Sequence, residues 1–107
     1  MAHNYKNAKV DLTATTATVL YTCPTATTTI VKSILVSEDS GSADTITVTI
    51  TDAAAAVFSV FKVKAVAANT TIELLTAPLV IEESEIIKVT AATANRLHVV
   101  ASFLEVS

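Results

Sequence analysis

The chain of 107 residues has the length of a single domain, and 51% of its residues are apolar while only 16% are charged. Its net charge of −3, without a basic cluster, argues against nucleic-acid binding, and the absence of Trp removes the best stacking platform for bases or sugars. The single cysteine, Cys23, excludes an intramolecular disulfide and a cysteine-based zinc site, and is interpreted as a small buried hydrophobe.

Residues 1–9 are polar and are predicted to form an N-terminal arm in front of a domain of residues 10–107. The candidate partner contacts on this arm are His3, Tyr5, Lys6 and Lys9. The alternative is a frayed terminus. The arm lacks the apolar segment of a signal peptide, and no apolar run approaches the ~18 residues that span a membrane. These features predict a protein that is made in a cytoplasm and kept or assembled there.

About eight or nine short strands follow, at spacings near ten residues. Their expected positions are residues 10–13, 16–22, 27–37, 44–52, 57–66, 70–75, 78–81, 86–90 and 96–106. This pattern predicts an all-β fold, a single antiparallel β-sandwich or jelly-roll-like domain. An α/β fold is disfavoured because no convincing helices alternate with the strands.

The strand at residues 44–52 is expected to lie at the centre of a sheet. Its aliphatic residues alternate with threonines, so that one face enters the core and the other is polar. A threonine face can bind ice when neighbouring strands repeat it, but only this strand repeats it fully, which favours an outward face or a polar interface. The core predicted from the two-residue period comprises Leu20, Ile34, Val36, Ile46, Val48, Ile50, Leu74, Ile87, Val89, Val99 and Phe103.

Residues 38–43 contain the only glycine, Gly41, and are predicted to join 27–37 and 44–52 as a hairpin. Within 27–37, strict alternation places Ile30 with Ile34 and Val36 on one face, and Val31 with Leu35 on the other.

Residues 57–66 have two possible interpretations, a strand or a helix. Asp52 before four alanines could cap a helix. The β-branched and aromatic residues of 57–66 favour a strand instead.

No pattern in the sequence supports catalysis, a metal or a cofactor. His3 and His98, the only histidines, lie far apart in the sequence, and one glycine allows neither a phosphate-binding loop nor a nucleophile elbow. The adjacent acidic residues, Glu38 with Asp39 and Glu82 with Glu83, lie in turns that do not hold a fixed carboxylate separation. We therefore expect a protein that is not an enzyme. His98 is interpreted as a structural or interface residue.

The chain resembles a group of small structural proteins of tailed bacteriophages. The resemblance rests on residues 19–24 (VLYTCP), 30–37 (IVKSILVS), 42–48 (SADTITV), 73–75 (ELL) with 78–81 (PLVI), and 97–105 (LHVVASFLE). It implies a virion protein assembled in the host cytoplasm, either a head decoration (cement) protein or a tail, baseplate or fibre component. The implied partners are other virion proteins, such as the major capsid protein.

Self-association is a separate expectation, which follows from the composition. High apolar content with few charges on a small domain predicts a buried partner surface and hence a homo-oligomer, a trimer first and a dimer second. A host-surface glycan-binding module is the alternative from another functional class. The missing Trp counts against it, because lectin sites usually use aromatic platforms.

Overall fold

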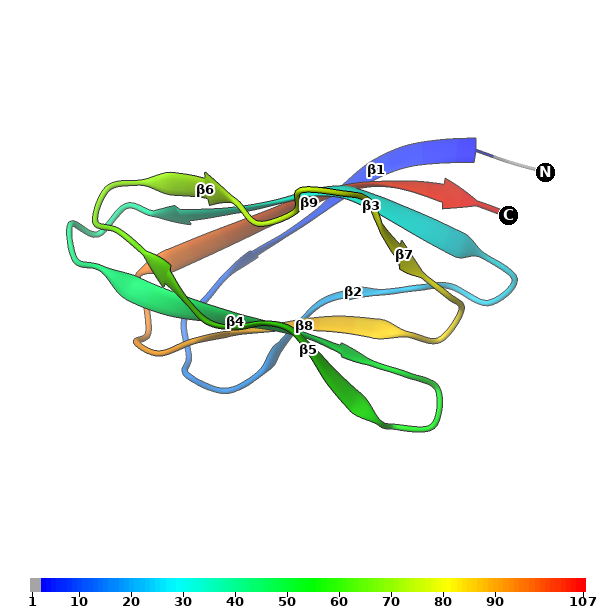
Figure 1. Ribbon diagram of the computed structural model, residues 1–107, viewed down its shortest axis with the longest axis horizontal. Helices are drawn as coiled ribbons and strands as arrows, with labels where there is room; N and C mark the ends of the chain where they lie inside the picture. Colours follow the sequence, from blue (N-terminus) through cyan, green and yellow to red (C-terminus); the bar gives the residue numbers. More distant parts are fainter. Residues whose placement is uncertain (1–2) are drawn as a thin grey trace.

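The computed structural model describes residues 3–107, and these form two antiparallel β-sheets packed against each other, without a helix (Figure 1). The first sheet has the order β1 (His3–Asp11), β9 (Leu97–Val106), β3 (Thr28–Glu38) and β6 (Thr71–Glu73), and β7 (Leu79–Ile81) also pairs with β3. The second sheet has the order β2 (Thr18–Thr22), β8 (Ile86–Ala91), β4 (Asp44–Thr51) and β5 (Val57–Val66). The all-β prediction is confirmed, and β4 is a central strand as expected.

The core lies between the two sheets. All predicted core residues are buried except Ile50, which is partly exposed but packs against the core. Cys23 is buried, as predicted for a small hydrophobe. Further buried side chains complete the core: Leu12, Val31, Val66, Ile81, Ala91, Leu97 and Ala101.

The predicted hairpin between residues 27–37 and 44–52 is wrong, because β3 lies in the first sheet and β4 in the second. The connection crosses between the sheets around the buried carboxylate of Glu38. Its oxygens accept hydrogen bonds from the backbone N–H groups of Ser40 (3.0 Å), Gly41 (3.0 Å) and Asn69 (3.2 Å), and from the Ser40 hydroxyl. Gly41 has φ +87°, which explains a glycine there. The turn is therefore organised by a carboxylate and not by strand pairing.

Glu38 makes the fold sensitive to acid. Burial alone would raise the pKa of Glu38, but the hydrogen bonds from Ser40, Asn69 and Gly41 outweigh it and lower the pKa to about 2. A folded-state pKa below the unfolded value contributes stability above the unfolded pKa, near 4.5, and this stability is lost as the pH falls toward 2.

We therefore expect Glu38→Gln to be less stable than the wild type at pH 7, and the difference to shrink between pH 4.5 and about 2. Thermal melting of both proteins across this pH range is the measurement. Other acidic groups titrate in both proteins, so the difference between the two isolates Glu38. A difference that stays constant down to pH 2 would contradict the assigned role.

The predicted faces of residues 27–37 are partly wrong, because β3 contains a bulge. Its register against β9 shifts between Val31 and Ser33. The extra residue moves the alternation by one, so that Val31 is buried together with Ile34 and Val36. Ile30 consequently lies on the opposite, outward face.

Residues 57–66 form strand β5, so the helical alternative is wrong. Asp52 does act as a cap, but of a tight turn. Its carboxylate accepts hydrogen bonds from the N–H groups of Ala54 and Ala56, both at 2.9 Å, and its backbone N–H donates to the carbonyl of Ala56. Ala55 has φ +66°, a left-handed conformation that stops helix formation at this point.

The segment predicted as an N-terminal arm, residues 1–9, forms part of a strand over residues 3–9. Residues 3–9 belong to β1, which pairs with β9 along its whole length, from His3 opposite Val106 to Asp11 opposite His98. The expected first strand at 10–13 thus begins earlier and ends at Asp11. The physical reason is that β9 provides the hydrogen-bonding partners, so that an edge strand needs few apolar side chains. Residues 1–2 of the predicted arm lie outside the described residues.

Candidate interaction surface

The side of the first sheet that points away from the core carries two rows of side chains with apolar members. We call this surface the outer face. The register aligns Val80, Ile30, Leu104 and Tyr5 in one row across β7, β3, β9 and β1. The second row runs across β6, β3, β9 and β1 and consists of Glu73, Leu35, Val100 and Lys9.

The apolar members of these rows are partly open to solvent. Tyr5 is 74% exposed, Val80 56% and Leu35 39%. A third row, Ser33, Ser102 and Asn7, separates the two apolar rows. On the outer face, rows that contain apolar side chains therefore alternate with a polar row, which suits contact with another protein.

Three of the four predicted contact residues lie together on the outer face. His3, Tyr5 and Lys9 occupy alternate positions of β1 and are exposed. The ammonium group of Lys32 lies 5.6 Å from the centroid of the Tyr5 ring, a cation–π contact. Lys6 differs, because it forms an ion pair of 2.8 Å with Glu105 of β9. Contact of these residues with a partner stays a prediction.

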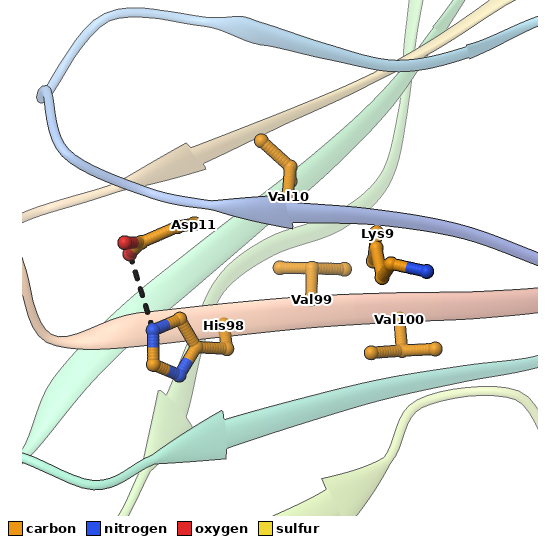
Figure 2. A pocket seen from close by; sticks show the side chains of 6 residues that line it. All are labelled: Lys9, Val10, Asp11, His98, Val99 and Val100. Atoms are coloured by element: carbon orange, nitrogen blue, oxygen red, sulfur yellow. Dashed lines mark ion pairs between the residues drawn. The ribbon is translucent and has the colours of Figure 1, made fainter.

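A shallow depression between β1 and β9 is lined by Lys9, Val10, Asp11, His98, Val99 and Val100 (Figure 2). The His98 imidazole lies between two carboxylates here. Its Nε2 is 3.2 Å from Oδ1 of Asp11, and its Nδ1 is 3.4 Å from Oδ2 of Asp39 in the loop after β3. These pairs join the edge strand and the loop to β9, which agrees with the structural role predicted for His98. Among residues 3–107 there is no group of three or more His, Cys, Asp or Glu side chains that could hold a metal ion.

A polar network at the other end of β9 links the two sheets. The Tyr21 hydroxyl of β2 donates to the Glu105 carboxylate (2.5 Å) and hydrogen-bonds with the Thr29 hydroxyl (2.7 Å). The Cys23 thiol lies 3.3 Å from the same Thr29 oxygen. Hydrogen bonds from Lys6 and Tyr21 outweigh burial and lower the pKa of Glu105, whereas burial and the Glu105 carboxylate raise the pKa of Tyr21. The network therefore keeps the Glu105 carboxylate ionised between the two sheets.

This network was not predicted from the sequence, although the alternation in β9 contained a signal for it. Glu105 follows Leu97, Val99, Ala101 and Phe103 in the inward-facing series of β9. A carboxylate at a core position needs partners in the fold, because an unpaired buried charge is costly. The residues that supply them are far away in the sequence, and no spacing rule identifies them.

No protein-family model matches the chain, and no curated protein matches it. Residues 3–107 also contain no helix long and apolar enough to cross a membrane.

Proposed function

We propose that this chain is a structural protein of a tailed-bacteriophage virion, most specifically a capsid decoration protein that stabilises the head through protein–protein contacts. It acts without catalysis and without a cofactor. Other virion proteins, the major capsid protein first among them, are its partners. The sequence resemblance supplies the virion context. The outer face supplies the surface by which such a protein would attach.

The outer face is the observation that carries this proposal. Exposed apolar side chains that lie next to one another on a soluble protein often mark a surface that contacts another protein. Here Ile30, Leu104 and Val80 are neighbours in one row, and Leu35 and Val100 are neighbours in the other. A binding face on a rigid sheet fits a protein that adds to a preformed lattice, because little conformational entropy is lost on attachment.

The finer fold that we propose is a jelly roll. The strand pairs are nested, β1 with β9, β2 with β8, β3 with β6 and β7, and β4 with β5. Nested pairs are what rolling up one long antiparallel hairpin produces, and counting β6 and β7 as one interrupted strand yields the eight strands of a jelly roll. The fold is compatible with a virion protein, but the functional argument rests on the outer face.

The proposal is tested with heads purified with and without the protein. Heads that carry it should withstand heat or low salt better, because a protein that binds only the intact lattice stabilises that lattice by mass action. Equal robustness of both kinds of heads, with the protein located on tails, would instead support a tail, baseplate or fibre component. Retention on a host-glycan surface, without binding to heads, would favour the glycan-binding alternative.

A matched pair of variants tests the surface itself. Leu35→Glu places a charge among the apolar side chains of the outer face, and Thr49→Glu places the same charge on the outward side of β4, in the other sheet. We expect Leu35→Glu to weaken binding to heads at least about tenfold, equivalent to roughly 1.4 kcal/mol, while Thr49→Glu binds as the wild type does. Equal binding by both variants would remove the outer face from the proposal.

A further inference from the structure

Among the described strands, β1 forms one edge of the first sheet. β5 has two register shifts against β4 and carries Lys62 and Lys64, and β2 is five residues long with a register shift. β6 and β7 are only three residues each. Interruptions, lysines and short length are the features by which proteins keep sheet edges from pairing. β1 also carries two lysines, Lys6 and Lys9, but it is nine residues long and pairs with β9 without a register shift.

One hydrogen bond shows which backbone N–H and C=O groups of β1 point toward β9 and which point away from it. Leu12, just after β1, donates its backbone N–H to the carbonyl of Leu97, at 3.0 Å. In an antiparallel pair, alternate residues direct their backbone groups to the partner strand. Even-numbered residues of β1 therefore face β9, and the N–H and C=O groups of Tyr5, Asn7 and Lys9 face away from it. Among the described strands, β1 pairs with β9 alone.

We propose that two copies of this chain pair antiparallel through β1, about a two-fold axis at Asn7. This register pairs all nine residues of β1. It places Asn7 opposite Asn7 of the second copy, Tyr5 opposite Lys9, and His3 opposite Asp11. The chain is thus complementary to itself, with an aromatic ring facing an ammonium group and an imidazole facing a carboxylate. Registers centred on Lys6 or Lys9 would instead oppose two lysines.

Two of these contacts extend interactions already present in one copy. Lys32 lies over the Tyr5 ring, so Lys9 of the second copy would approach a ring that already binds one ammonium group. Asp11 already pairs with His98, and the second copy would bring His3 to the same carboxylate. The other lysine of β1, Lys6, does not obstruct the edge, because it is paired with Glu105.

The pairing would also join the two outer faces. Because Tyr5 meets Lys9, the row of Val80, Ile30 and Leu104 in one copy continues into the row of Val100 and Leu35 in the other. The result is one continuous sheet with a doubled apolar surface. The dimer is independent of the virion assignment, since it concerns the purified protein in solution. Its failure would leave the head-binding test untouched.

Cysteine cross-linking tests the register. Asn7→Cys places two thiols on the axis, where the Cα atoms of a hydrogen-bonded pair lie about 5.5 Å apart, within disulfide range. Lys9→Cys is the matched control: it lies on the same strand and face, but the Cα atoms of its two copies would be about 14 Å apart. Under mild oxidation we expect Asn7→Cys to form a linked dimer and Lys9→Cys to stay unlinked. Mixing Tyr5→Cys with Lys9→Cys should yield a linked heterodimer. Cys23 is buried and remains in all proteins.

Sedimentation of the wild type and Asn7→Pro provides the second measurement. The backbone N–H of Asn7 points away from β9. Proline at this position therefore removes the donor that the second copy needs and spares the hydrogen bonds to β9. We expect a wild-type dimer at tens of micromolar, and a folded Asn7→Pro monomer whose dimerisation is weakened at least tenfold. A wild-type monomer, a trimer, or linking of Lys9→Cys in place of Asn7→Cys would overturn the proposal. If Asn7→Pro does not fold, the cross-linking pattern decides alone.

Discussion

Val48→Asp is expected to leave the chain unfolded at all temperatures. Val48 is completely buried in the middle of β4, opposite Val89 of β8 and Phe61 of β5, without a cation in that register. Burying an unpaired carboxylate costs several kcal/mol, which is comparable with the roughly 5–15 kcal/mol that stabilise a domain. Circular dichroism and amide dispersion in NMR spectra would reveal the loss of structure.

Thr49→Asp is the matched control for this substitution. It introduces the same side chain at the next residue, where it points outward and lies opposite Lys88. Its free energy of unfolding should stay within about 1 kcal/mol of the wild-type value. A Val48→Asp protein with wild-type melting behaviour would contradict the assignment of Val48 to the core, and with it the orientation of β4.

Phe103→Ala is expected to lower the free energy of unfolding by about 3–5 kcal/mol, the usual cost of removing a buried aromatic side chain. Phe103 is 3% exposed, and its ring centroid lies 4.3 Å from that of Tyr21 at an interplanar angle of 45°. Its removal opens a cavity beside the network that joins β2 to β9. Denaturant unfolding monitored by tyrosine fluorescence measures the change.

Leu104→Ala provides the comparison, because the neighbouring side chain lies on the outer face. In the isolated protein we expect this substitution to cost about 1 kcal/mol, since Leu104 is only partly buried. Equal losses at residues 103 and 104 would mean that the two faces of β9 are covered to the same extent, which the assigned orientation excludes.

The interaction surface could be anticipated only in part. His3, Tyr5, Lys6 and Lys9 were predicted as contact residues because residues 1–9 are polar. The same polarity predicted an arm, since so polar a stretch contains little that signals a strand. Its pairing with β9 bridges almost the whole chain, as in His3 opposite Val106. The same pairing directs Lys6 to Glu105 and the other three side chains to the outer face.

The sequence by itself determined the all-β class, most strand positions and most of the core, because a two-residue period and turn residues are local signals. It did not determine which strands are neighbours. The connection after β3 looked like a hairpin turn, yet it crosses between sheets because the Glu38 carboxylate collects the N–H groups of Ser40, Gly41 and the distant Asn69. Likewise, the bulge that buries Val31 exists only against the register of β9. Strand order, bulges and the outer face arise from contacts between distant segments, and only the tertiary structure brings those segments together.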